Sequence, residues 1–321
     1  MIRKIRTMLL LGTLTAFAAC SSSDDAPGET PNPGPGQEPQ EPSKSYTDLR
    51  VVSYNVRVDN SADGTNAWTY RKEGAVTMIG RELPVVMGLQ EAQAHQITYL
   101  AQNCPDYAWY GLGRDTAAVP PETLSYSREE TMAIFYDTRA VELQDKGTFW
   151  LSETPDKVSK GWDANYNRTC TWGQFRHKES GRIFFFFNTH LDDSGKVARE
   201  ESVKLLVAKM KEINPRRRPS FLTGDFNSNT TDAIFTPLFA YMNDARAKAP
   251  VTDNRATWNN YTGTSTAKYD HIFYNGDNCT AREYRTLDGD YGVPYLSDHY
   301  PVAAVFRFQY LFVFSICFCI D

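Results

Sequence analysis

Six short polar motifs, most of them ending a hydrophobic run, carry the residues of this chain that could do chemistry. They are Ser53-Tyr54-Asn55, Leu89-Gln90-Glu91, Asn188-Thr189-His190-Leu191, Gly224-Asp225-Phe226-Asn227, Tyr269-Asp270-His271 and Ser297-Asp298-His299. Their recurrence where strands should stop predicts that several strand ends converge on one site. Carboxylates with Asn and His, and no Cys among them, suit a hard cation such as Mg²⁺ and a phosphoryl group.

Each motif alone also has a structural interpretation. Glu91 follows an expected buried strand and could bind a cation, or it could be an acid stabilised by the dipole of a helix N-terminus. Asn55 could be a ligand, or a cap or turn residue. Asp225 and Asn227 alternate about Phe226, so they could hold a water or a phosphoryl oxygen between them, or form an Asx turn.

The histidines divide into two groups. A carboxylate near an imidazole sets its tautomer and stabilises its protonated form, and Asp270, Asp298 and His299 offer such a pairing. The imidazolium could then donate to a phosphoryl oxygen, and His190, at the end of a Phe-rich run, could do the same. We predict structural or surface roles for His95, His177 and His271.

The elements that must position these residues alternate between strands and helices. Short, bounded apolar runs predict strands at 51–55, 84–89, 133–136, 182–191, 220–223, 271–274 and 302–308. Apolar residues at helical spacing predict helices over 71–81 and 196–213. Long polar loops at 59–69, 113–128 and 150–167 are expected to shape a cleft.

No linker interrupts this alternation, which predicts one α/β domain over 48–308 with sheets sandwiched between helices. Four aromatic residues in a row, Phe184–Phe187, predict a strand that is buried on both faces. Cys104, Cys170 and Cys279 have no metal-like spacing and are predicted to be buried thiols, with a disulfide as the alternative.

The N-terminal residues have the layout of an export signal. A basic start and an apolar run too short for an ordinary transmembrane helix predict a signal peptide over 1–19. Cys20 after small residues resembles a bacterial lipobox, which implies lipidation of Cys20 and an outer-membrane lipoprotein of the cell envelope, facing the periplasm or the surface. A plain secretory signal with an incidental Cys is the alternative.

The segments that flank the domain are not expected to build its core. Residues 20–47 are rich in Pro, Gly, Glu and Ser and predict a disordered tether between membrane and domain. The apolar tail 309–321 could be an extra strand, a membrane-touching end or a non-native extension from a shifted reading frame. The net charge of −5 argues against a non-specific nucleic-acid binder, which would need a basic surface.

Together the motifs resemble the ordered signature of the endonuclease/exonuclease/phosphatase superfamily, which includes DNase I-like nucleases, sphingomyelinases and inositol-polyphosphate phosphatases. The resemblance covers residues 48–308. Gly147–Ser152 and Gly161-Trp162-Asp163 resemble a bacterial lipoprotein branch. His271 departs from the Tyr that is usual in the family. The resemblance implies a DNase I-like, four-layer α/β/β/α sandwich.

The resemblance also implies a metal site. Glu91 would be the main Mg²⁺ ligand, with Asn55 beside it and Asp298 joining them. Mn²⁺ could substitute for Mg²⁺. Arg57 and Arg168 are further candidates for phosphate contact, or surface cations.

Catalytic roles follow from the same resemblance. Asp225 would orient or deprotonate the attacking water, with Asn227 bound nearby. Asp270 would pair with His299, and both His190 and His299 would stabilise charge on the phosphoryl oxygens.

We therefore predict a Mg²⁺-dependent phosphoesterase of the cell envelope that directs water at a phosphodiester or a phosphomonoester. Its substrate would be a phosphorylated small molecule, a lipid headgroup or a nucleic acid, and the protein would be a monomer held to the membrane by its lipid. The alternative is a non-catalytic surface binding lipoprotein on the same fold. Loss of a motif residue would favour that alternative, and none is lost.

Overall fold

The structure is a computed structural model that describes residues 44–311. The predicted signal peptide 1–19, the lipidation site Cys20, and most of the tether 20–47 and the tail 309–321 lie outside the described residues. Residues Lys44–Ser53 of β1 (Lys44–Asn55) pair with the whole of β14 (Val302–Leu311), so the pairing extends past both predicted domain boundaries, 48 and 308. In the part that the structure describes, no helix is both long and apolar enough to cross a membrane.

Two six-stranded sheets form the centre of the fold. The first contains, in spatial order, β13 (Cys279–Thr286), β14, β1, β2 (Val86–Gln90), β6 (Ile134–Asp137) and β4 (Tyr107–Tyr110). The second contains β11 (Asn243–Asp244), β12 (Asp270–Asn275), β10 (Ser220–Asp225), β9 (Ile183–His190), β8 (Thr169–His177) and β7 (Val141–Trp150). A two-stranded ribbon pairs β3 (Ala92–Gln93) with β5 (Glu130–Thr131).

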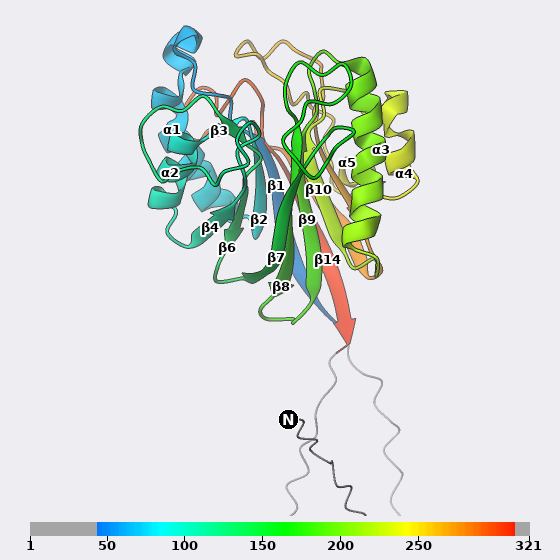
Figure 1. The fold of residues 1–321 in the computed structure, drawn as a ribbon. Helices are drawn as coiled ribbons and strands as arrows, with labels where there is room; N and C mark the ends of the chain where they lie inside the picture. The colour runs from blue at the N-terminus through cyan, green and yellow to red at the C-terminus, as the bar shows by residue number, and fades with distance from the viewer. Residues whose placement is uncertain (1–43, 312–321) are drawn as a thin grey trace, which may run out of the picture. The chain divides into compact units, whose positions relative to one another are not determined.

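Helices cover the outer faces of the two sheets (Figure 1). α1 (Trp68–Glu82) and α2 (Ala94–Asn103) lie on the first sheet, and α3 (Lys196–Ile213) with α4 (Thr236–Phe239) lies on the second. The remaining short helices are the 3-10 turns Ser61–Asn66 and Ala233–Phe235 and α5 (Ala245–Lys248). The predicted four-layer α/β/β/α sandwich is therefore confirmed.

Strand alternation explains the layers. Along β9, Phe184 and Phe186 point into the core between the sheets, whereas Phe185 and Phe187 pack in the core beneath α3. All four side chains are buried, as predicted for the aromatic run. Successive residues of a strand face opposite sides, so this strand supplies two cores at once.

Two connections between parallel strands place the polar motif residues at one end of the molecule. β1 leads through α1 to the parallel β2, and β9 leads through α3 to the parallel β10. The carboxyl ends of parallel neighbours lie at the same edge of a sheet, so Asn55 is beside Gln90, and Asp225 is beside His190. β12 runs antiparallel to β10 and begins where β10 ends, which sets Asp270 opposite Asp225.

The two sheets are joined by a buried amide cluster that Asn188 organises. Its Nδ2 donates to the carbonyl oxygens of Leu89 and Ala133 at 2.8 and 3.0 Å. Its Oδ1 accepts from Gln90 Nε2 at 2.7 Å and from Thr223 Oγ1 at 3.2 Å.

A glycine makes room for this amide cluster. A Cβ at Gly88 would lie only 2.3 Å from Thr223 Oγ1 and 2.4 Å from Asn188 Oδ1. The close approach of the sheets at this point therefore requires glycine at residue 88.

Every predicted strand and helix is present. The helix predicted over 196–213 has those bounds. The strand predicted over 51–55 begins seven residues earlier, at Lys44, and the other predicted strands differ from the observed ones by at most three residues at either end. Four longer strands that were not predicted complete the sheets: β4, β7, β8 and β13. Cys104, Cys170 and Cys279 are buried free thiols, as predicted.

Candidate active site

The strand ends converge on one cavity of about 560 Å³. Eight of the predicted site residues line it: Arg57, Glu91, Arg168, His190, Asp225, Asn227, Asp298 and His299. Asn55 and Asp270 lie behind them, since each hydrogen-bonds to a lining side chain. The structure thus brings together the ten predicted site residues that fall within its described part.

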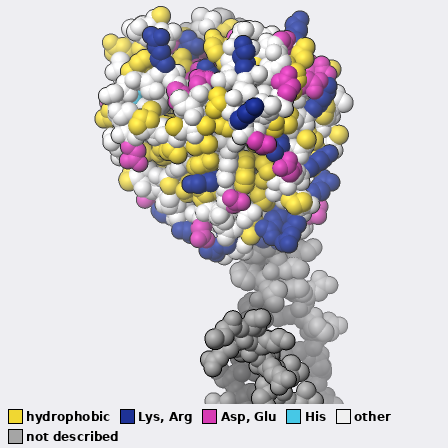
Figure 2. Space-filling view, viewed as in Figure 1, with side chains coloured by type: hydrophobic (Ala, Val, Ile, Leu, Met, Phe, Trp, Pro, Cys, Tyr) yellow, Lys and Arg dark blue, Asp and Glu magenta, His cyan; other side chains and the backbone are white. Residues whose placement is uncertain are grey.

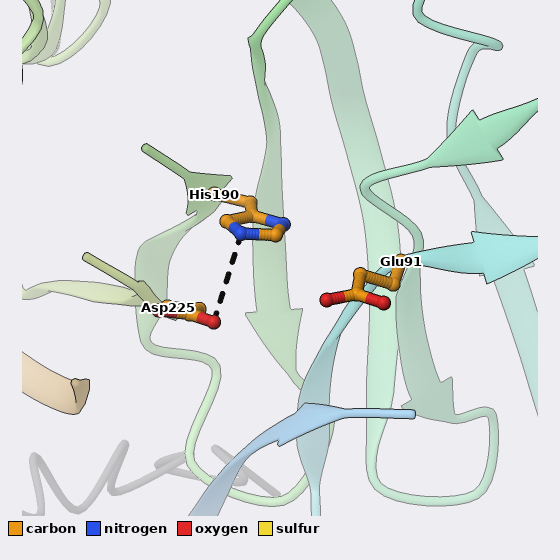
Figure 3. A group of neighbouring side chains, drawn as sticks. All are labelled: Glu91, His190 and Asp225. Atoms are coloured by element: carbon orange, nitrogen blue, oxygen red, sulfur yellow. Dashed lines mark ion pairs between the residues drawn. The ribbon is translucent and has the colours of Figure 1, made fainter. Parts of the chain in front are cut away.

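Asn55 is the last residue of β1, and Glu91 directly follows β2. Glu91 has a left-handed backbone (φ +59°), and its carboxylate points toward His190 and Asp225 (Figure 3). Asn55 Nδ2 donates to Glu91 Oε1 and to Asp225 Oδ2, at 3.0 Å in both cases. Asn55 Oδ1 accepts from the Arg57 N–H at 2.9 Å. Asn55 therefore bridges two carboxylates, and its oxygen would face a cation only after the amide turned over.

Glu91 is held in its ionised form. Burial favours the neutral acid, but hydrogen bonds from the Val58 N–H and from Asn55, together with the charge of Arg57, lower the pKa of Glu91. The Val58 N–H donates to Oε2 at 3.0 Å, so each oxygen of this carboxylate accepts one bond.

Asp225 ends β10, where the chain lies close to β9. A Cβ at Gly224 would lie 2.5 Å from the Thr189 carbonyl oxygen, which explains the glycine before the aspartate. Asp225 Oδ1 accepts from the Asn227 N–H at 2.9 Å, and Asn227 adopts a left-handed backbone (φ +47°). Burial, with the negative charge of Asp270 nearby, raises the pKa of Asp225 to about 7.

His299 and Asp270 form a buried pair. His299 Nδ1 lies 2.8 Å from Asp270 Oδ2, and its Nε2 lies 3.6 Å from Asp225 Oδ2. Burial opposes the charge, but Asp270 and Asp225 outweigh it and raise the pKa of His299 well above its ordinary value. This histidine is therefore an imidazolium, as its predicted pairing with Asp270 requires.

His190, in contrast to His299, is a neutral imidazole. Burial, and then the positive charges of Arg168, Arg114 and His299, lowers its pKa well below the ordinary value. Its Nε2 lies 3.1 Å from Asn227 Nδ2, an amide donor, so this nitrogen is the acceptor of a neutral ring. Figure 3 marks the longer contact of 3.6 Å between His190 Nε2 and Asp225 Oδ2.

Both arginines that were predicted to contact phosphate line the cavity, but each forms ion pairs with aspartate side chains. Arg57 Nε lies 3.1 Å from Asp63, and Arg57 Nη1 lies 3.6 Å from Asp298 Oδ2. Arg168 is buried and pairs with the carboxylates that follow β9, Asp192 at 3.2 Å and Asp193 at 3.1 Å.

Arg114, Glu130 and Tyr166 also line the cavity, and none of them was predicted. Arg114 Nη1 donates to Glu130 at 2.6 Å, and the guanidinium groups of Arg114 and Arg168 lie 4.9 and 5.3 Å from the centroid of the Tyr166 ring. Burial raises the pKa of Glu130 to about 7. Arg114 and Tyr166 lie in the loops 113–128 and 150–167, which were expected to shape a cleft. The sequence feature that could have identified these two residues was therefore the long polar loops, not a motif.

The donors present fit a divalent hard cation. Glu91, His190 and Asp225 each offer a ligand atom, and these atoms lie within 4.8 Å of one another. His190 Nδ1 and Asp270 Oδ1 are buried without a hydrogen-bond partner among the described residues. Keeping several carboxylates buried together is costly even when they accept hydrogen bonds, so a bound cation would stabilise a cluster of this kind.

Buried carboxylates, an imidazolium and cavity-lining arginines on an α/β/β/α sandwich define a hydrolase that acts on phosphoester bonds. The chain belongs to the endonuclease/exonuclease/phosphatase family, whose model matches residues 52–299.

Solved structures agree with this assignment. An endonuclease/exonuclease/phosphatase family protein of Bacteroides thetaiotaomicron is 34% identical, with a TM-score of 0.75 over 82% of this chain and 99% of that one. The mannosyl-6-phosphatase of Bacteroides thetaiotaomicron is also 34% identical, with a TM-score of 0.74 over 80% of this chain and 99% of its own. Among sequence relatives, an uncharacterised protein of Acanthamoeba polyphaga mimivirus is 24% identical over 75% of this chain and 92% of its own.

Proposed function

We propose that the protein is a Mg²⁺-dependent phosphomonoesterase that acts on a phosphorylated sugar. The observation that carries this proposal is the convergence of the ten predicted site residues on one cavity, with Asp225 between Asn55 and His299. The mannosyl-6-phosphatase relative, which this chain matches over 99% of that protein's length, supports a sugar monoester as the substrate class.

The carboxylates supply the proposed metal site. Glu91 would hold Mg²⁺ together with Asp298 and with Asn55, whose amide would have to turn over to present its oxygen. Mn²⁺ could substitute for Mg²⁺. When bound, the cation would supply positive charge to the phosphoryl oxygens. The ionised state of Glu91 supports this role, because a hard cation binds a carboxylate rather than a carboxylic acid.

The chain's own groups account for the movement of protons. Asp225 would accept a proton from the attacking water, and its raised pKa makes it a stronger base than an ordinary aspartate. His299, held by Asp270, would donate a hydrogen bond to a phosphoryl oxygen. Neutral His190 would accept from Asn227, which fixes the ring beside the same oxygens.

The surface supports a small substrate over a nucleic acid. On the face seen in Figure 2, Lys and Arg side chains are interspersed with acidic and hydrophobic ones. A nucleic-acid enzyme would be expected to present a basic stripe along which the phosphates lie. We therefore place nucleic acids below a phosphosugar as a substrate class.

The location forms part of the proposal. Lipidation of Cys20 and a tether over 20–47 would hold the domain, as a monomer, to the outer membrane. The order of basic, apolar and small residues before Cys20 supports this location.

Hydrolysis assays test the proposal directly. The purified protein should release phosphate from mannose 6-phosphate with Mg²⁺ and not with EDTA. Glu91→Ala should lower kcat/KM by roughly 10²–10³-fold, since it removes an electrostatic contact made in the transition state. Glu73→Ala, at an exposed position of α1, is the matched control and should keep full activity.

Two results would contradict the proposal. Full activity in Glu91→Ala would rule out the metal-ligand assignment. A folded wild-type protein without turnover on sugar phosphates, p-nitrophenyl phosphate or its bis-ester would favour the non-catalytic binding alternative.

A further inference from the structure

A second cavity of about 520 Å³ adjoins the first. Trp258, Asn260 and Tyr269 line both cavities, so these three residues form the boundary between them. The Trp258 and Tyr269 rings are stacked, with centroids 6.0 Å apart and planes inclined by 30°. A volume of this size is within the range of about 300–1,000 Å³ that is typical of small-molecule sites.

The second cavity has a different chemistry from the first. Within the described part of the chain, its lining contains no charged side chain and is formed mainly by hydroxyl and amide groups beside the two aromatic rings. Among these are Thr262, Thr264 and Thr266. The first cavity, in contrast, is lined by three arginines and five acids.

The wall between the cavities is fixed to the catalytic residues. Thr257 Oγ1 accepts from the backbone N–H of Asp270 at 3.0 Å, and the Asn260 N–H donates to the Asp298 carbonyl oxygen at 2.9 Å. Trp258 forms a β-bridge with His299. A ligand that contacts Trp258 would therefore have a defined position relative to the reacting phosphate.

We propose that the second cavity binds a neutral sugar joined to the phosphorylated one, so that the substrate is a phosphorylated oligosaccharide rather than a free sugar phosphate. This inference rests on the proposed phosphosugar hydrolysis. Hydroxyl and amide groups can exchange hydrogen bonds with sugar hydroxyls, while the aromatic rings can pack against the apolar C–H face of the ring.

The charge of the lining favours a sugar chain over a nucleotide chain. Aromatic rings would also stack on a nucleobase, but each further nucleotide brings a phosphate that calls for Lys or Arg. Among the residues that the structure describes, no cationic side chain lines the second cavity. Charge therefore decides between the two ligand classes.

Paired substrates test the inference. The probes are mannose 6-phosphate and the mannose disaccharide that carries this phosphate on its non-reducing unit. Wild type should have a kcat/KM about tenfold higher for the disaccharide, a difference within reach of one added sugar contact. Thr266→Trp, which fills the second cavity, should bring the ratio of the two kcat/KM values close to one.

The ratio of the two kcat/KM values does not depend on the folded fraction of a variant, because partial unfolding lowers the activity on both substrates equally. Thr280→Trp, at an exposed position of β13, is the matched control and should keep the wild-type ratio. A wild-type ratio of one, with both sugars hydrolysed, would overturn the inference and leave the proposed function standing. Faster hydrolysis of a 5′-phosphorylated dinucleotide than of either sugar would also overturn it.

Failure of the proposed function has its own signature, which is that neither sugar phosphate is hydrolysed. The second cavity is then tested by titrating unphosphorylated mannobiose into the full protein in a calorimeter. Binding that Thr266→Trp abolishes and Thr280→Trp retains would support a sugar site. No heat of binding in wild type would overturn it.

Discussion

The two cavity histidines show how their surroundings separate identical side chains into different roles. Asp270 and Asp225 raise the pKa of His299, whereas burial and nearby cations lower that of His190. Opposite shifts of this kind are typical of groups that divide acid and base work between them. One imidazole is thus a donor with positive charge, and the other a neutral acceptor.

Side-chain NMR can check this difference in the metal-free protein. Near neutral pH, we expect both ring nitrogens of His299 to carry protons and only one nitrogen of His190 to do so. Spectra of His190→Gln and His299→Gln assign the signals. Two neutral rings would contradict the predicted charge on His299.

Asp270→Asn should neutralise the charge that keeps His299 protonated. We expect the His299 pKa to fall and kcat to drop by roughly 10²–10⁴-fold, the usual contribution of a positioned acid or base. The stability linked to His299 is fully present below its unfolded pKa of about 6.5 and is lost as the pH rises through the folded value. The variant should therefore lose stability mainly at acid and neutral pH, as measured by urea unfolding.

Asp277→Asn is the matched control for Asp270→Asn, because Asp277 is exposed and does not line the cavity. It should change neither the His299 signals nor kcat. An unchanged His299 pKa in Asp270→Asn would show that the pair contributes nothing to the charge.

At the level of single residues, the sequence was informative where chemistry and strand ends coincide. Asp225 and Glu91 could be predicted because each lies within three residues of the end of an apolar run and belongs to a motif that resembles the family signature. Glu130 and Trp258 could not, because they lie in polar segments where one more acid or aromatic carries no pattern. Only the fold shows that these segments border the cavity.

Among the elements, β2 and β9 matter most because they connect the two sheets. Asn188 on β9 completes hydrogen bonds with the carbonyl groups of Leu89 and Ala133 and with the side chain of Gln90. Glu91 follows β2 and His190 ends β9, so this amide sets the distance between the two halves of the site.

Asn188→Ala should cost about 2–4 kcal/mol in the free energy of unfolding, because it leaves buried polar groups without partners. We expect kcat to fall as well, since the two halves of the site lose their common support. Urea unfolding and turnover on mannose 6-phosphate measure the two effects.

Asn103→Ala, at the exposed end of α2, should cost far less stability and keep full turnover. A loss in Asn188→Ala no greater than that in the control would show that the amide cluster does not hold the sheets together.

Local sequence patterns are sufficient to predict some of the helices and strands but not others. α3 was predicted with its observed bounds because its buried side chains recur at helical spacing, among them Val203, Leu206 and Met210. β7 and β13 were missed because both carry exposed polar residues and an irregularity in register, which interrupts the period of two. Neighbouring strands, rather than local sequence, define them.

For the whole molecule, the net charge of −5 leads to a prediction about competitors. A short single-stranded DNA should compete poorly with mannose 6-phosphate at physiological salt, and lowering the salt should improve its competition only slightly, because few phosphate contacts are available. Inhibition assays at two salt concentrations measure this. Strong competition with a steep salt dependence would return nucleic acids to the candidate substrates.

The strand ends at the opposite side of the sandwich have a practical consequence. β14 ends at the tip away from the site loops, and Lys44, where β1 begins, pairs with Leu311 at that same tip (Figure 1). If the protein were coupled to a solid support through either of these strand ends, the entrance of the first cavity would face away from the support. Protein coupled to beads in this way should still act on polysaccharides that are too large to diffuse between the bead and the protein. Passing phosphorylated polysaccharides of increasing size over a column of such beads, and measuring the phosphate released, would show how large a substrate the entrance admits.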